Sequence, residues 1–306
     1  TVNPLFASRN AAGVAFDNLV VAAVTSAPAG STQPNSSPTP TPTPTPSQLV
    51  NVSTRARVET GAGNEIIGGF IITGSGNKNV IIRGLGPSLQ NMGLTDFLAN
   101  PTLELRGSSG VLATNQDWRD TQEGAIKATG IPPLYDVESA IVASLPAGGY
   151  TAILKGLGGG TGLGLIEVYD LATGATTRLA NLSTRASVKT GNNVMIGGFY
   201  VDAGTGGANI AVRALGPSLT SFGVAGALPD PTLELRDGDG TLILSNDDWQ
   251  DNTAQATALT AAGMAPSNNK EAAVIKFLAP GAYTAIVQGR NGTPTGVGLV
   301  EVYNLP

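Results

Sequence analysis

The chain contains two tandem copies of one sequence of about 130 residues. The run Arg83-Gly-Leu-Gly-Pro-Ser-Leu89 returns as Arg213-Ala-Leu-Gly-Pro-Ser-Leu219, a spacing of 213 − 83 = 130 residues. Further on, Trp118 has its counterpart in Trp249. This period is too long for the unit of a solenoid and is typical of a whole domain. The sequence therefore predicts two copies of one domain, over residues 49–175 and 176–306.

Each copy has the pattern of an all-β fold. Short runs rich in Val, Ile, Leu and Thr alternate with Gly, Pro, Asn and Ser, which is typical of strands joined by turns. One short helix is expected in each copy, over residues 121–129 and 253–262, because each run begins with a threonine and is followed by a glycine. We predict two tandem antiparallel β-sandwich domains of jelly-roll type. Strands are expected in the first copy at residues 49–59, 65–73, 79–83, 101–106, 111–114, 139–145, 150–155 and 163–171.

Two segments precede the repeats. Residues 30–48 form a linker in which Pro and Thr alternate from Pro38 to Pro46. Proline at every second position excludes helix and sheet and favours an extended spacer, with a reach of about 50 Å at roughly 3 Å per residue. Threonines in such a tract are candidate O-glycan acceptors. These are Thr39, Thr41, Thr43 and Thr45.

Residues 1–29 contain a strand that is apolar on both faces between Val14 and Val24. A segment this short cannot bury such a surface alone, so it must lie against another surface. It is either a donor strand for a neighbouring molecule, the remnant of an upstream domain, or a strand that docks on its own repeats. The first alternative uses the linker well and would produce head-to-tail filaments. Its assembly residues would be Val14, Phe16, Leu19, Val20, Val21 and Val24.

Composition excludes several kinds of chemistry. Cysteine and histidine are both absent, so the chain has no thiol nucleophile, no Cys/His zinc site and no Ser-His-Asp triad. A net charge of −5 argues against a nucleic-acid partner, and no apolar run is long enough to span a membrane. We therefore expect a protein that is not an enzyme. The start at Thr1 fits either a processed mature chain or a truncation.

The loop before each helix carries carboxylates and a tryptophan, as in Asn246-Asp-Asp-Trp249. Carboxylates at such spacing can ligate calcium, or they can cap the following turn and helix. The tryptophan either plugs one end of the sandwich or stacks on a glycan. We expect no cofactor unless these loops bind calcium. Its candidate ligands are Asp117, Asp120, Asp247, Asp248 and Asp251.

A few charges recur inside apolar strands of both copies. Arg55, Arg83 and Glu167 are matched by Arg185, Arg213 and Glu301. Buried charges are costly unless they are paired, so we expect ion pairs or backbone hydrogen bonds that tie the sandwich together. The serine of each Gly-Pro-Ser motif has no histidine base, so a nucleophilic role is not expected.

The second copy resembles the bacterial pre-peptidase C-terminal type of domain. The likeness rests on Asp230-Pro-Thr-Leu-Glu-Leu-Arg236, on the Asn-Asp-Asp-Trp loop and on Leu278-Ala-Pro-Gly-Ala-Tyr283; the first copy matches through residues 100–118 and 145–153. The resemblance implies a secreted bacterial jelly-roll module that binds, spaces or anchors and carries no catalytic residues.

Two functions follow as expectations. The first is an extracellular structural protein of the cell surface, a filament or matrix subunit that self-associates through its N-terminal strand. The alternative is the C-terminal accessory region of a larger secreted enzyme or adhesin, with a polysaccharide or surface glycan as partner.

Overall fold

The fold is all-β, as predicted. The computed structural model describes residues 47–61, 63–172, 176–204, 206–292 and 294–305. In the first repeat the elements are β1 (Leu49–Val58), β2 (Ile66–Leu85), η1 (Pro87–Met92), β3 (Pro101–Gly107), β4 (Gly110–Asn115), α1 (Glu123–Ala128), β5 (Ser139–Gly156), η2 (Leu157–Gly159) and β6 (Gly162–Asp170). In the second they are β7 (Arg178–Val188), η3 (Gly191–Asn193), β8 (Met195–Val201), β9 (Ala208–Leu215), η4 (Pro217–Phe222), β10 (Pro231–Asp237), β11 (Leu242–Asn246), α2 (Thr253–Ala261), β12 (Ala272–Leu278), β13 (Gly281–Gly289), η5 (Arg290–Gly292) and β14 (Gly296–Leu305).

The strands of the two repeats share two layers. One layer, here the first layer, has the order β11-β10-β13-β8-β1-β6, followed by the second half of β2 and the first half of β5. The second layer has the order β4-β3, the second half of β5, the first half of β2, then β7-β14-β9-β12. Because β2 and β5 run through both layers, the hydrogen bonds form one network of 14 strands.

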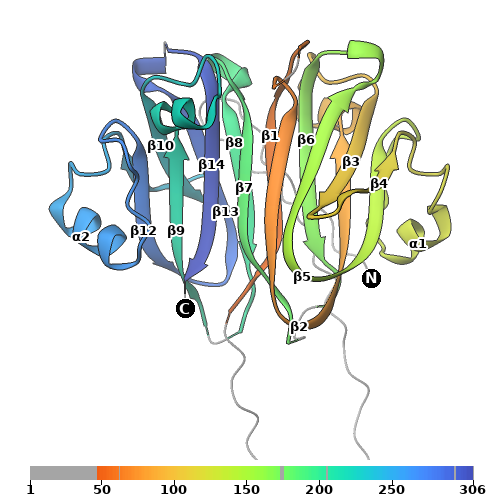
Figure 1. The fold of residues 1–306 in the computed structure, drawn as a ribbon, viewed down its shortest axis with the longest axis horizontal. Helices are drawn as coiled ribbons and strands as arrows, with labels where there is room; N and C mark the ends of the chain where they lie inside the picture. Colours follow the sequence, from red (N-terminus) through yellow and green to blue (C-terminus); the bar gives the residue numbers. More distant parts are fainter. Residues whose placement is uncertain (1–46, 62, 173–175, 205, 293, 306) are drawn as a thin grey trace, which may run out of the picture.

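The first strand of each repeat joins the two copies. β1 pairs with β6 of its own repeat on one side and with β8 of the other repeat on the other side. β7 does the same with β14 and the first half of β2. Figure 1 shows β1 and β7 side by side in the middle of the molecule, with α1 and α2 at opposite ends. Each layer is therefore built half from one repeat and half from the other.

One hydrophobic core runs through both repeats. Its largest cluster of buried residues includes Phe70 and Leu182, which belong to different copies and lie on paired strands. At its centre Thr54 donates a hydrogen bond from Oγ1 to Oγ1 of Thr184, its counterpart 130 residues later, at 2.9 Å. The all-β class is confirmed, but two separate tandem sandwiches are not, because the strand pairs and the core cross the boundary between the copies.

The predicted strands differ from the observed ones mainly in length. Residues 65–73 and 79–83 merge into the single strand β2, with a register shift between Ile72 and Asn77. Likewise β5 covers both 139–145 and 150–155. In the second repeat the equivalent strands are interrupted, as β8 and β9 and as β12 and β13.

Both predicted helices are present. α2 begins after Asn252, whose side chain accepts hydrogen bonds from the N–H groups of Ala254 and Gln255, both at 3.1 Å. Gly130 and Gly263 follow the two helices with φ of 77° and 69°, the left-handed conformation that glycine tolerates best. No helix in the described part of the chain is long and apolar enough to cross a membrane.

Each tryptophan lies beneath the helix of its repeat. Trp118 packs with Ile126 of α1, and Trp249 with Leu259 of α2, in two satellite clusters. Their exposed fractions are 2% and 8%. They pack against the outer strands rather than plugging an end of the sandwich, and they are too buried for glycan stacking.

Candidate functional site

Four of the six recurring charges inside the strands form ion pairs, as predicted, and Arg55 donates to a backbone carbonyl. Arg185 has neither contact with the described residues. Arg83 Nε donates to Glu167 Oε2 at 2.7 Å, and Arg213 Nε donates to Glu301 Oε2 at 2.8 Å. In the second repeat the Tyr303 hydroxyl also donates to Glu301. Burial, with the Glu301 carboxylate beside it, raises the pKa of Tyr303 to about 12. The paired charges are used in holding the sheet together.

A second pair of buried carboxylates holds the Gly-Pro-Ser turns, and it was not predicted. Glu138 accepts hydrogen bonds from the N–H groups of Gly86 at 3.0 Å and Ser88 at 2.7 Å. Glu271 holds the second turn in the same way, and both glutamates are fully buried. The hydroxyls of Ser88 and Ser218 donate to these carboxylates. The sequence did carry a signal for this contact, because Glu138 directly before β5 recurs as Glu271 directly before β12.

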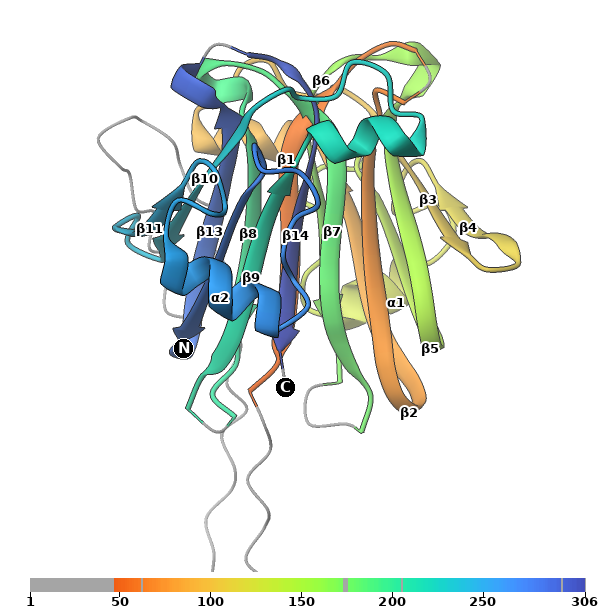
Figure 2. The same ribbon diagram turned by 60° about the vertical axis from the view of Figure 1, so that its left-hand side comes forward.

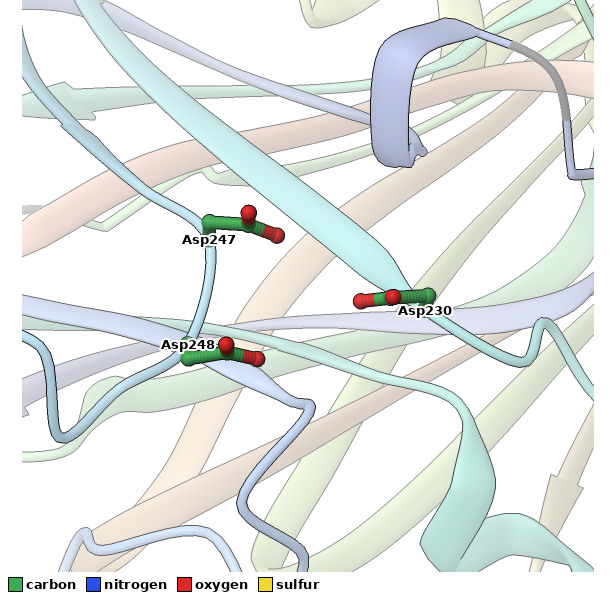
Figure 3. Close-up of side chains that lie close together, drawn as sticks. All are labelled: Asp230, Asp247 and Asp248. Atoms are coloured by element: carbon green, nitrogen blue, oxygen red, sulfur yellow. The ribbon is translucent and has the colours of Figure 1, made fainter.

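The candidate calcium ligands are only partly brought together. Asp247 and Asp248 meet Asp230, which precedes β10, and one carboxylate oxygen from each lies within 4.8 Å of the others (Figure 3). Asp120 and Asp251 are exposed and lie outside this group of three. The structure does not test whether these loops bind calcium.

Arg290 of η5 already reaches this aspartate triad. Its Nε lies 3.0 Å from Asp247 Oδ2, and its Nη1 lies 3.7 Å from Asp248 Oδ2 and 3.8 Å from Asp230 Oδ2. Burial raises the pKa of Asp247, while Arg290 opposes the shift and the neighbouring carboxylates add to it. The triad therefore has a cation from its own chain.

The first repeat lacks both the triad and its arginine. Asn100 and Leu157 stand where the second repeat has Asp230 and Arg290. The N–H of Leu157 donates to the carbonyl of Asn100, just as the N–H of Arg290 donates to the carbonyl of Asp230. Gln116 and Asp117 stand where the second repeat has Asp247 and Asp248. Only Asp117, the counterpart of Asp248, is kept in the first repeat, so the other two carboxylates occur together with the arginine, which is the pattern of a structural ion cluster.

An open pocket of about 540 Å³ lies on the outer face of the second layer, where the two repeats meet. We call it the repeat-junction pocket. Figure 2 shows η4, in teal, close to the end of β9 at the edge of this face. The pocket is lined by Ile67, Gly69, Thr151, Ser183, Arg185, Arg213, Leu215, Ser218, Leu219, Phe222, Val224, Ala265, Pro266, Ser267, Glu271, Leu299 and Glu301.

Strand register explains its floor. Ile67 pairs with Arg185, Arg185 with Leu299, and Leu299 with Leu215, so these four side chains form one row across β2, β7, β14 and β9. The next row outward along the same face has Gly69, Ser183, Glu301 and Arg213. A Cβ at Gly69 would lie 2.8 Å from Ser183 Oγ, so glycine keeps this part of the floor open.

Two polar groups in the pocket lack a partner. The Nε of Arg185 is buried without a hydrogen bond, and Arg185 has no ion pair with any residue that the structure describes. Glu271 is fully buried, and its Oε2 likewise has no hydrogen bond. A small number of polar groups in a largely apolar concavity is typical of a ligand site.

The proposed assembly residues 14–24 and the candidate glycan acceptors in the Pro/Thr linker lie outside the described residues. The structure therefore does not test them.

Comparison with known proteins finds no relative. No protein-family model matches the chain, and no curated protein sequence matches it. Among solved structures, tandem family 51 carbohydrate-binding modules of a family 98 glycoside hydrolase from Streptococcus pneumoniae align over 82% of this chain and 81% of theirs, at 7% identity and a TM-score of 0.23. A chain of the Sulfolobus turreted icosahedral virus aligns over 86% and 90%, at 12% identity and a TM-score of 0.20. Scores this low carry no argument about fold or function.

Proposed function

We propose that the protein is a non-enzymatic structural protein of the bacterial cell surface, which assembles head-to-tail when residues 14–24 of one molecule add a strand to the sheet of the next. The observation that carries the proposal is an open sheet edge at β4. Within the described residues β4 pairs only with β3. Val111 and Leu112 on this edge are 51% and 45% exposed.

An edge of this kind favours strand addition. Its outer N–H and C=O groups have no partner among the strands that the structure describes, and an incoming strand supplies main-chain hydrogen bonds together with apolar burial. A donor strand with apolar residues on both faces would cover Val111 and Leu112. The equivalent edge strand β11 pairs only with β10 among the described strands and exposes Leu242, so β4 is the more apolar acceptor.

The arrangement of charges supports a role without catalysis. The pairs Arg83–Glu167 and Arg213–Glu301, and the backbone N–H groups bound by Glu138, commit these recurring charges to structure. A general acid or base needs a group that is free to exchange a proton with a substrate. The resemblance to secreted pre-peptidase C-terminal modules points the same way.

Negative-stain microscopy and mass photometry of three variants test the assembly. Deletion of residues 1–29 should leave folded monomers, and Val111→Lys/Leu112→Lys should block polymerisation by placing charges on the acceptor edge. Leu134→Lys is the matched control, because Leu134 is 65% exposed but lies on no strand. It should polymerise like the parent chain. Filaments of normal length from the deletion variant would refute strand exchange.

A second candidate function is favoured by the repeat-junction pocket. In this alternative the chain is the accessory region of a larger secreted enzyme or adhesin and binds a glycan or matrix polymer. The pocket has the size range of a small-molecule site and contains two unpartnered polar groups. Retention of the purified chain on an immobilised polysaccharide tests it.

A further inference from the structure

The repeat-junction pocket is the open counterpart of a site that is closed in the other layer. The row Ile67–Arg185–Leu299–Leu215 has its equivalent across β8, β1, β6 and β2. There Ile196 pairs with Arg55, Arg55 with Leu165, and Leu165 with Leu85, and all four are buried. In the second layer Ile67, Arg185 and Leu299 are only half-buried. The row in the first layer is thus covered, whereas the equivalent row in the second layer is accessible.

The arginine of this row differs in its partners. Arg55 is 4% exposed, and its Nη2 donates to the carbonyl of Asn192 at 3.2 Å. Arg185 has no such bond from the described residues. A guanidinium without a partner among the described residues offers a planar fork that matches a carboxylate.

The buried glutamate differs in the same sense. In the first repeat, Oε2 of Glu138 accepts from the Ser88 hydroxyl at 2.6 Å and from the Tyr135 N–H at 3.3 Å. In the second, the Ser218 hydroxyl and both turn N–H groups donate to Oε1 of Glu271, which leaves Oε2 unpartnered. A buried acceptor without a donor is costly. A hydroxyl of a ligand would satisfy it.

One substitution between the repeats removes a large side chain from this region. Phe97 packs over Leu85, Leu89, Leu163 and Leu165 in the first repeat. Its counterpart is Ala227, as the matching bridges Phe97–Leu163 and Ala227–Val297 show. Three residues equivalent to those that Phe97 covers line the pocket instead. At its rim Phe222, the counterpart of Met92, is 81% exposed and offers an aromatic face.

We propose that the repeat-junction pocket binds a carboxylated sugar, such as a uronic acid unit of an extracellular polysaccharide. The carboxylate would meet Arg185, a ring hydroxyl would donate to Glu271 Oε2, and the apolar face of the ring would lie against Leu299 and Phe222. A neutral sugar lacks the anion, and a simple dicarboxylate lacks the hydroxyls and the ring. This inference rests on the second candidate function and is independent of self-assembly.

Titration of the ¹⁵N-labelled full chain with D-glucuronate, D-glucose and succinate tests the proposal. Glucuronate should shift backbone resonances around Arg185, Phe222 and Glu271 in a saturable way. Glucose and succinate should bind at least 10-fold more weakly. Equal affinity for glucose and glucuronate would overturn the carboxylate assignment while leaving a glycan-binding function intact. No saturable shift with either sugar would overturn the ligand class. Retention on a polysaccharide without any of these shifts would place the glycan-binding function elsewhere on the molecule.

Three variants locate the site. Ala227→Phe restores the side chain that fills the first repeat and should abolish binding while the protein stays folded. Arg185→Gln should weaken glucuronate binding at least 10-fold. Arg178→Gln, on the same strand but outside the pocket, should leave it unchanged. Full glucuronate affinity in folded Ala227→Phe would refute the location.

Discussion

The buried ion pair between Lys78 and Asp170 provides the most informative test of the energetics, because the second repeat lacks it. Lys78 Nζ donates to Asp170 Oδ2 at 2.7 Å and to the carbonyl of Ala172 at 2.9 Å, and both charged side chains have an exposed fraction of 0%. Strand register places Ala208 and Asn304 at the equivalent positions, where the Asn304 side chain donates to the Ser47 carbonyl at 2.9 Å. The chain thus contains its own neutral version of this site.

Lys78→Ala should lower the free energy of unfolding by about 3–5 kcal/mol, because it leaves the Asp170 charge buried without its cation. Lys78→Ala/Asp170→Asn copies the residue types of the second repeat and should regain most of that loss. Both variants create the same cavity, so their difference isolates the unpaired charge. Guanidinium chloride unfolding followed by tryptophan fluorescence measures each value. If the double variant is as unstable as the single one, the charge argument is wrong and packing of the lysine stem explains the loss.

Three further outcomes are expected. Thr54→Val should cost about 1–3 kcal/mol by leaving the Thr184 hydroxyl unpaired, whereas Thr54→Val/Thr184→Val should be nearly neutral; an additive double-mutant cycle would contradict a contact between the repeats. Because the pKa of Tyr303 is raised to about 12, its contribution to stability is complete below pH 10 and is lost as the pH rises from 10 towards 12. The melting temperature of Tyr303→Phe should fall less between pH 10 and pH 12 than that of the parent chain. Equal falls would contradict the raised pKa of Tyr303. Since Arg290 already reaches the aspartate triad, melting temperatures in EDTA and in millimolar calcium should agree, and a rise with calcium would contradict this expectation.

The sequence predicted the local structure well and the connection between the repeats poorly. Alternation and turn residues were sufficient for the strands, and glycine marked the end of both helices. The pairing of β1 was beyond reach, because Ile67-Gly-Gly-Phe70 and Ile196-Gly-Gly-Phe199 are identical. An identical partner strand in either copy satisfies the apolar face of β1 equally well, so the pattern cannot decide which one it joins. That choice depends on loop length and on packing of the whole core.

The candidate site divides in the same way. The pairs Arg83–Glu167 and Arg213–Glu301 were predicted, because recurring charges within apolar strands require partners. The pocket was not, because it depends on differences between the copies, among them Ala227 in place of Phe97. Such a difference means little in a linear sequence and matters only where strand register brings Arg185 and Leu299 together. For the tryptophans, the sequence left glycan stacking open, and only their burial in the structure argues against it.

The central claim is that the two repeats form one folding unit with a shared core. The chain has two tryptophans, one in each repeat. Labelling both with 5-fluorotryptophan gives one ¹⁹F reporter under α1 and one under α2, without any mutation. A urea titration should convert both native resonances to their unfolded positions with the same midpoint, because strands β1 and β7 cannot leave one repeat without disrupting the other. Two distinct midpoints would show that the repeats unfold separately, and would contradict the claim.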